Sequence, residues 1–218
     1  MARQYSKGAR TENAFREAAR QEFAARGYLS TKVEDIARAA GRSSASFYNY
    51  FTDKADVLTA LAREFHEDTR TQIAVPYQKG RPPDEAVRMA ITIFWETYRD
   101  RLGALSGVFQ ASMVDPNFLR SWREIRRSAI DFIALGIERA QKDGYCPGID
   151  PRMTASALSS MLEHFCYVWL AQGGDDEDSL LDEQTAIDSL VSIWYHAIYW
   201  KPKDERPRAG RGARTRSS

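Results

Sequence analysis

Hydroxyl, amide and phenol groups are concentrated in one short stretch of the chain. Within it Phe47 and Phe51 lie four residues apart, so both can face the core if the stretch is helical. The polar residues left facing other directions are Ser44, Ser46, Tyr48, Asn49 and Tyr50. Short donors and acceptors on an exposed helix suit the base edges of a DNA major groove and its phosphates. The pattern therefore predicts a DNA-reading helix of about eight residues.

A turn and a supporting helix must position this reading helix. Thr31 and Glu34 have the spacing of a capping box, which predicts the start of the supporting helix. Its apolar residues repeat at helical spacing: Val33, Ile36, Ala37 and Ala40. Gly41 tolerates the left-handed backbone that ends a helix, and Ser43 can cap the next one. A further helix from Thr11 to Arg26 is predicted to pack against this pair.

The stretch from Thr31 to Lys54 resembles the DNA-binding region of the TetR family of bacterial repressors. The matching residues are Val33, Asp35, Ile36, Ala37, Ala40, Gly41, Ser43, Phe47, Tyr48, Tyr50, Phe51 and Lys54. The resemblance implies a homodimer that binds palindromic double-stranded operator DNA and is released by a small effector. The chain departs from the family pattern at Arg42, where an apolar residue is usual. Arg42 either lays its stem over the turn or contacts a phosphate, and both readings stay open.

These considerations give a set of expected DNA contacts. We assign Ser46 and Tyr48 to the groove, and Thr31, Tyr50 and Lys54 to phosphates, with the Lys54 contact implied by the family. The complete set is Thr31, Lys32, Arg42, Ser43, Ser44, Ser46, Tyr48, Asn49, Tyr50 and Lys54.

Charge is distributed unevenly along the 218 residues, although the net charge is only +1. Residues 1–54 carry +4, the tail from Lys201 to Ser218 carries +5, and the part between them carries −8. This asymmetry fits a basic nucleic-acid-binding end on an acidic body. No signal peptide or bilayer-length apolar run is apparent, so we expect a cytoplasmic protein without a membrane partner. Cys146 and Cys166 are expected to be free thiols.

The spacing of apolar residues predicts an all-α chain of about nine helices. We expect an N-terminal three-helix DNA-binding domain with a helix-turn-helix, followed by a helical ligand-binding and dimerisation domain. The boundaries are a flexible basic arm at 1–10, the DNA-binding domain at 11–54, the body at 55–200 and a disordered basic tail at 201–218. Asp115 with Pro116, and Asp150 with Pro151, are helix start signals.

Most of the large aromatic residues in the second half are expected in the core. Small residues on the same helices, and the polar Glu163 and His164 inside apolar stretches, predict that some of the aromatics line a cavity for a small lipophilic effector. The body resembles that of a mycobacterial TetR-family member with a long apolar ligand channel, in three segments: Ile93–Tyr98, Ala157–Glu163 and Leu190–Tyr199. The expected ligand-binding set is Phe94, Tyr98, Phe109, Met113, Trp122, Phe132, Ser159, Leu162, Glu163 and Trp194. That member has amide side chains where this chain has Ser159 and Leu162, so the same ligand is not implied.

The last two long helices hold more apolar residues than one domain would need. Leu158, Met161, Leu162, Phe165 and Trp169 mark the first, and Ile187, Leu190, Val191, Trp194 and Ile198 mark the second. The resemblance implies that these helices form a four-helix bundle with a second subunit.

Catalytic and cofactor motifs are missing from the sequence. Ser106 lacks the spacing of a nucleophile elbow, and there is no phosphate loop or dinucleotide fingerprint. Glu163, His164 and Cys166 are close in sequence, but on a helix His164 points away from the other two, which disfavours a shared metal ion. We expect no cofactor, no metal and no enzymatic activity. The alternative is a helical small-molecule binder or enzyme whose DNA-binding head is secondary.

Overall fold

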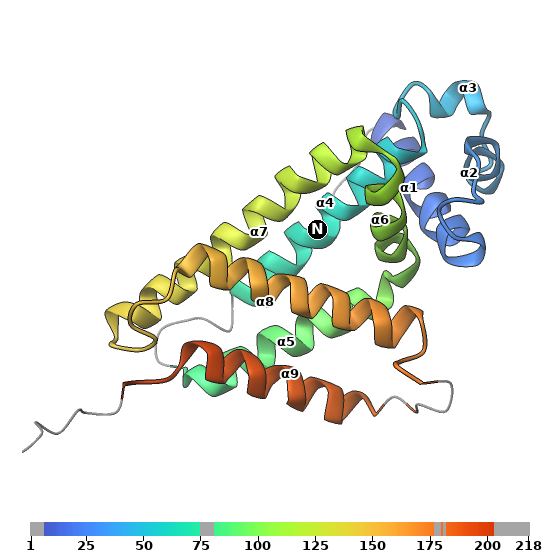
Figure 1. Ribbon diagram of the computed structural model, residues 1–218. Helices are drawn as coiled ribbons and strands as arrows, with labels where there is room; N and C mark the ends of the chain where they lie inside the picture. Colours follow the sequence, from blue (N-terminus) through green and yellow to red (C-terminus); the bar gives the residue numbers. More distant parts are fainter. Residues whose placement is uncertain (1–6, 75–80, 177–179, 181, 203–218) are drawn as a thin grey trace, which may run out of the picture.

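The computed structural model describes residues 7–74, 81–176, 180 and 182–202, and in this part of the chain it contains nine α-helices and no strand (Figure 1). The helices are α1 (Lys7–Arg26), α2 (Val33–Ala39), α3 (Ser44–Phe47), α4 (Lys54–Ala74), α5 (Pro83–Asp100), α6 (Leu102–Val114), α7 (Pro116–Lys142), α8 (Pro151–Cys166) and α9 (Glu183–Ile198). A π-helical turn, Tyr167–Ala171, follows α8 directly. The prediction of an all-α fold with about nine helices is confirmed for these residues.

Helices α1, α2 and α3 form a small head at one end of the molecule (Figure 1). Helix α4 runs from the head into the body, where it packs against α5 and α7. Helix α8 packs on α7, and α9 packs on α5. Helix α6 packs on α1 as well as on α4 and α7, so it is a second connection between head and body.

The turn between α2 and α3 has the predicted backbone. Gly41 has φ +65°, and the N–H of Arg42 donates to the carbonyl of Ala37 at 2.9 Å, which closes α2 with a Schellman-type bond. Ser43 caps α3, because its hydroxyl accepts the N–H of Ser46 at 3.1 Å. The predicted caps Asp115 and Asp150 are also present, each followed by proline in the first helical position.

Three local predictions are wrong. The start of α2 is Lys32 with Asp35, whose carboxylate accepts the Lys32 N–H at 3.1 Å, and not Thr31 with Glu34. Helix α3 spans four residues and gives way to turns after Phe47, so it is shorter than predicted. Helix α1 begins at Lys7, so the end of the predicted arm is helical. Residues 1–6 and most of the predicted tail, from 203 onward, lie outside the described residues.

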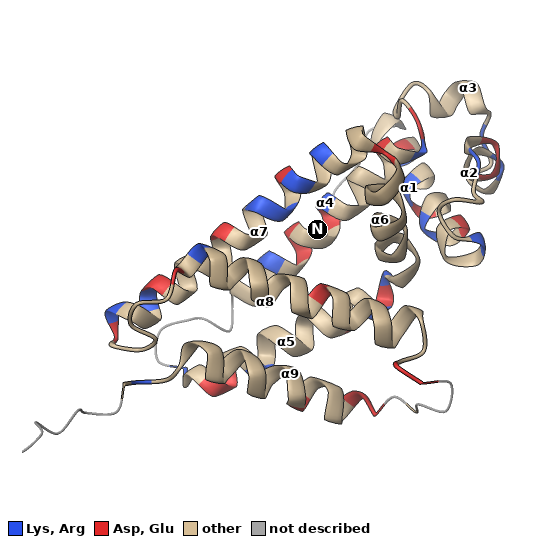
Figure 2. Cartoon of the chain, in the orientation of Figure 1, with Lys and Arg blue, Asp and Glu red and all other residues tan. Residues whose placement is uncertain are grey.

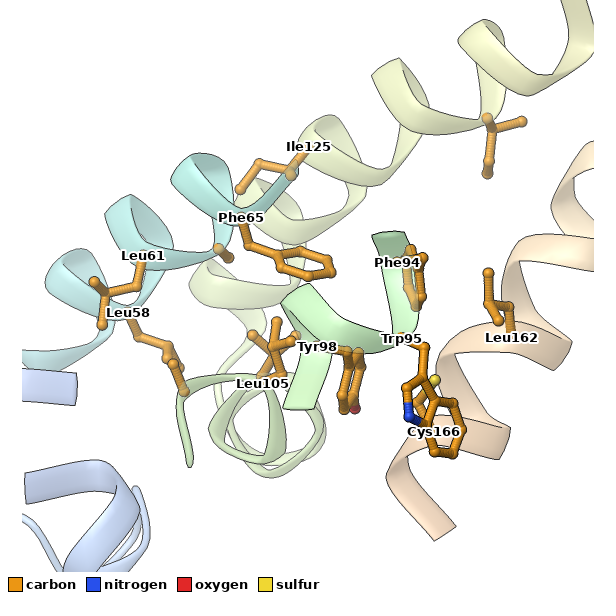
Figure 3. Packing of buried hydrophobic residues seen from close by; sticks show 14 of the residues in the cluster. Leu58, Leu61, Phe65, Phe94, Trp95, Tyr98, Leu105, Ile125, Leu162 and Cys166 are labelled. Carbon is orange, nitrogen blue, oxygen red and sulfur yellow. The ribbon is translucent and has the colours of Figure 1, made fainter. Parts of the chain in front are cut away.

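One hydrophobic core extends from the head into the body. Figure 3 shows Phe65 of α4 pointing toward Phe94 and Tyr98 of α5. The Phe65 ring lies edge-on to both, with centroid separations of 5.5 Å to Phe94 and 6.1 Å to Tyr98. Cys146 and Cys166 are separate buried thiols, as predicted.

Helix α6 approaches α1 most closely at Gly103. A Cβ atom on this residue would lie 2.6 Å from the backbone nitrogen of Ala24 and 2.7 Å from its Cβ. These distances are far below van der Waals contact, and the atoms belong to the backbone region of a helix that cannot move aside locally. Glycine is therefore required where α6 meets the head.

We predict that Gly103→Ala lowers the free energy of unfolding by roughly 1–3 kcal/mol, the usual effect of overpacking. Gly136→Ala is the matched control, because Gly136 lies inside α7 with open space around its Cα. There alanine should raise the free energy of unfolding by about 0.5–1 kcal/mol through its higher helix propensity. Urea denaturation of both variants measures the difference, and equal stability of the two would show that α6 and α1 are not in this close contact.

Candidate functional site

The head presents a polar surface around α3. Arg42, Ser43, Tyr48 and Asn49 are exposed, with Tyr48 57% exposed. Ser44, Ser46 and Tyr50 are half-buried beside them, and Lys32 is exposed at the start of α2. Eight of the ten expected DNA-contact residues therefore reach the surface of the same small unit.

Buried aromatic rings hold this surface in place. Phe47 is fully buried, packs edge-on against Phe15 of α1 at 5.4 Å between centroids, and lies 5.5 Å from Phe51. The Phe47 ring also meets the Tyr48 ring edge-on at 5.7 Å. Because Phe47 is anchored in the core, Tyr48 is held pointing outward at the end of α3.

The side chains of Thr31 and Lys54 donate hydrogen bonds to carbonyl groups within the protein. The Thr31 side chain is buried and its hydroxyl donates to the carbonyl of Gly27 at 2.8 Å. The Lys54 ammonium donates to the carbonyls of Tyr28, Leu29 and Thr31 at 2.8, 3.1 and 2.9 Å, and it lies 4.5 Å from the centroid of the Tyr28 ring. Partial burial lowers the pKa of Lys54. This placement argues against phosphate contacts by these two side chains, which instead fasten the α1–α2 loop to α4.

The exposed Arg42 folds back over the turn, where its Nη1 donates to the carbonyl of Gly41 at 3.0 Å. No acidic residue pairs with it in the described part of the chain. The guanidinium therefore covers the turn in this conformation and still has free donors for a phosphate.

A cavity of about 320 Å³ lies in the body between α4, α5, α7, α8 and α9. Six of the ten expected ligand-binding residues line it: Phe94, Phe132, Ser159, Leu162, Glu163 and Trp194. Figure 3 shows Phe94 of α5 and Leu162 of α8 facing each other across this part of the core.

The other four expected residues lie elsewhere. Tyr98 is buried beside Phe94, and Phe109 packs against Tyr167 with ring centroids 4.6 Å apart. Met113 is 77% exposed at the end of α6. Trp122 does not line the cavity, and its ring centroid lies 5.3 Å from that of His66, which does. The prediction that these four line the cavity is wrong.

Much of the wall comes from residues of α4 and α7 that the sequence analysis did not assign to the ligand site. From α4 it includes Arg63, His66, Glu67, Thr69, Arg70 and Ile73, and from α7 Glu124, Ile125, Ser128, Ala129 and Ile133. A signal for two of them was present. His66 and Thr69 lie four residues after Ala62 and Phe65, so they continue the apolar stripe of α4 with polar side chains.

A polar cluster interrupts the apolar wall on α8. The Ser159 hydroxyl donates to Glu163 Oε1 at 2.8 Å, and Arg126 Nε donates to Glu163 Oε2 at 3.2 Å. Burial raises the pKa of Glu163, although Arg126 and the Ser159 hydrogen bond act in the opposite direction. Glu163 and Cys166 are buried whereas His164 is exposed, so the three do not converge.

His66 is a second polar group in the wall, and its side chain is half-buried. Burial, assisted by the charge of Arg126, lowers its pKa from 6.5 to about 4, so the imidazole is neutral at pH 7. Its Nε2 is buried and has no hydrogen-bond partner in the part of the chain that the structure describes.

Most of the apolar residues expected at a dimer surface are instead buried within the single chain. Leu158, Leu162, Ile187, Leu190, Val191, Trp194 and Ile198 are all buried. That part of the prediction is wrong, because α8 and α9 need these residues to pack on α7 and α5. Met161, Phe165 and Trp169 remain partly exposed, and Ile193 is 52% exposed. Figure 2 shows few charges along α8 and α9, whereas charges of both signs alternate along α7.

Two family models match the chain. Residues 15–61 match the model of bacterial regulatory proteins of the tetR family, and residues 87–200 match the C-terminal domain of the transcriptional regulator EthR. Among the described residues, no helix is long and apolar enough to cross a membrane.

Similar proteins are named as transcriptional regulators. The regulator EthR of Mycolicibacterium smegmatis is 26% identical over 175 residues, which cover 79% of this chain and 78% of EthR. The regulator YdgC of Bacillus subtilis is 27% identical over 207 residues, covering 92% and 99%. A TetR-family structure from Syntrophomonas wolfei has a TM-score of 0.74 at 16% identity, covering 88% of this chain and 97% of that one, which shows the same fold.

Because the pKa of His66 is lowered in the folded chain, we expect the stability of the fold to depend on pH in the acid range. Above pH 6.5 the ring is neutral in both the folded and the unfolded chain, so stability there is independent of its protonation. Between pH 6.5 and about 4 the unfolded chain binds a proton that the folded chain does not, so the free energy of unfolding falls as the pH falls. The loss amounts to roughly 3 kcal/mol at the acid end.

His66→Gln should remove this part of the pH dependence, whereas His196→Gln, at an exposed position of α9, should not. Urea denaturation at about pH 7.5 and about pH 4.5 measures it for the three proteins. An unchanged pH dependence in His66→Gln would contradict the assignment.

Proposed function

The chain belongs to the TetR family of bacterial regulatory proteins, with a C-terminal domain of the EthR type, and we propose that it is a transcriptional repressor released by a small lipophilic effector. In this proposal a cytoplasmic homodimer binds a palindromic operator through the two heads. The effector occupies the cavity in the body, and the chain catalyses no reaction.

The exposed Tyr48 at the end of a capped, core-anchored helix is the observation that supports DNA reading most directly. A short helix start with free hydroxyls and an amide beside it can enter a major groove and meet base edges. Arg42 and Lys32 flank this surface as the exposed cations for neighbouring phosphates. The proposed interface therefore comprises Lys32, Arg42, Ser43, Ser44, Ser46, Tyr48, Asn49 and Tyr50.

Helices α8 and α9 support the proposed dimer. After Asp188, α9 has no Lys, Arg, Asp or Glu, and its outward face carries Ile193 with small residues such as Ser189 and Ala197. On α8, Met161 and Phe165 pack against the core and remain partly exposed. A surface with few charges and exposed apolar side chains suits a self-complementary two-fold interface. Two heads fixed by such an interface select two half-sites at a set spacing.

Helix α4 supports the coupling between effector and DNA. It contributes His66 and Thr69 to the cavity and begins at Lys54, which fastens the head. Twelve residues of helix separate His66 from Lys54, a length of about 18 Å. Arg20 of α1 also pairs with Glu64 of α4 at 2.6 Å, so a shift of α4 at the cavity moves the head. By linkage, an effector that weakens DNA binding binds more weakly to the DNA-bound form.

We predict that the protein retards DNA flanking its own gene in a gel shift at moderate salt, and that an excess of unrelated DNA does not compete. Tyr48→Ala should abolish the specific shift, because the groove contact is lost. The dimer, measured by light scattering, should persist. Met113→Ala is the control, since Met113 is also exposed but lies on α6, away from α3.

A specific shift that survives in Tyr48→Ala would contradict the assigned reading surface. Loss of the dimer in that variant would show that Tyr48 is misplaced. Absence of any specific shift by the wild type, with ligand binding intact, would instead favour the alternative of a helical small-molecule binder or enzyme.

A further inference from the structure

The hydrogen-bond donors of the polar cluster formed by Ser159, Glu163 and Arg126 are already engaged within the protein. Ser159 has one hydroxyl proton, and that proton is donated to Glu163 Oε1 at 2.8 Å. Arg126 Nε donates to the other carboxylate oxygen at 3.2 Å. The Nη2 of Arg126 is turned to the outside of α8, where it donates to Ser160 Oγ at 2.6 Å and Ser156 O at 3.4 Å. Arg126 is not among the residues that line the cavity.

What the cluster offers to the cavity is acceptor capacity. A carboxylate has about four lone-pair sites, and the two hydrogen bonds of Glu163 occupy only part of them. The Ser159 oxygen also keeps its lone pairs. On the facing wall, the Thr69 hydroxyl likewise donates to the Phe65 carbonyl at 2.7 Å. A ligand group that lacks a donor would leave these buried acceptors without a partner, which lowers the affinity by roughly 5- to 150-fold.

The charge of the cluster is already balanced. Glu163 is paired with Arg126, so the pair carries no net charge. A cationic ligand group would have to leave water for a site that offers no uncompensated anion, and an anionic group would meet the Glu163 carboxylate directly. The other charged residues of the wall, Arg63, Glu67, Arg70 and Glu124, are exposed and belong to its solvent side.

The size and the remaining walls restrict the ligand further. About 320 Å³ is at the small end of the range of roughly 300–1,000 Å³ for small-molecule sites. Phe94, Phe132, Leu162 and Trp194 supply apolar surfaces around it, and the neutral ring of His66 is the other polar group in the wall with a buried atom that lacks a partner among the described residues. The space therefore suits a compact, uncharged and largely apolar molecule whose polar end lies at the Ser159–Glu163 cluster.

We propose that the effector is a compact, uncharged apolar molecule that carries one hydrogen-bond donor, a hydroxyl or an amide N–H, and that this donor binds the Glu163 carboxylate beside Ser159. The term effector rests on the proposed function, whereas the binding chemistry rests on the cavity alone.

The experiment uses four probes with one skeleton and different ends: 4-phenylbutan-1-ol, its methyl ether, 4-phenylbutylamine and 4-phenylbutanoate. Each is titrated by calorimetry into the full chain without DNA, so failure of DNA binding leaves the result unaffected. The alcohol should bind at least about fivefold more tightly than each of the other three, since one unmatched buried acceptor or charge corresponds to that factor or more.

Substitutions then test whether the Glu163 carboxylate accepts the hydrogen bond of the alcohol. Glu163→Gln supplies an amide that can both donate and accept, so the preference for the alcohol over the ether should fall below about threefold. Glu138→Gln is the matched control, because Glu138 is exposed on α7 away from the cavity, and it should keep the full preference. The wild-type series decides the matter if Glu163→Gln fails to fold.

Equal or tighter binding of the ether, the amine or the carboxylate by the wild type would overturn the proposal. So would binding of none of the four probes, or an undiminished preference in a folded Glu163→Gln variant. A DNA gel shift that fails while the alcohol preference holds would refute the repressor function and leave this inference standing.

Discussion

Helix α4 must pack in both the head and the body of one continuous core, and the rest of the structure is arranged around that constraint. Near its start Leu58 and Leu61 are buried between the head and α6, and farther along Phe65 packs on α5. At its first residue Lys54 holds three carbonyls of the α1–α2 loop. Because a close-packed interior resists continuous deformation, displacement of one end of this helix is carried to the other.

The second connection, through α6, limits how the head can respond. At Gly103 the α6 and α1 backbones are in contact with no side chain between them, and Gly107 lies against the Tyr28 side chain. The head is therefore attached at two places, by a continuous helix and by a close packing contact. Two attachments favour rotation of the head as a rigid body over independent movement of α3. In the proposed dimer, such a rotation would alter the spacing between the two heads.

Local signals allowed much of the fold to be predicted, since glycine in a left-handed turn, hydroxyl and carboxylate caps and proline in a first turn act over a few residues. Gly41, Ser43, Asp115 and Asp150 are examples. The start of α2 was misjudged by one residue because Thr31 and Lys32 are both followed, three positions later, by an acidic residue. Only tertiary packing decides between them, and it takes Thr31 into the core, where its hydroxyl binds carbonyls.

The cavity could be predicted only in part, for the same reason. Aromatic residues on α5, α8 and α9 indicated an apolar space, but helical periodicity shows which residues face inward and not which inward faces leave a gap. Trp122 and Tyr98 therefore do not line the cavity, whereas His66, which was not expected there, does. Equally, periodicity could not tell a surface that packs on α5 from one that packs on another subunit, so the buried residues of α9 were assigned to the wrong partner.

The Arg126–Glu163 pair has little value as a stabilising contact. Removing two charges from water is costly, and a buried pair of this kind is often no better for stability than apolar side chains of the same volume. Here the burial is strong enough to raise the pKa of Glu163 against the effect of its own partner. A leucine beside Leu162 would fit an apolar wall without this penalty. The Glu163 carboxylate therefore contributes little or nothing to the free energy of folding. What it adds to the wall is a hydrogen-bond acceptor, which is of use only to a molecule that occupies the cavity.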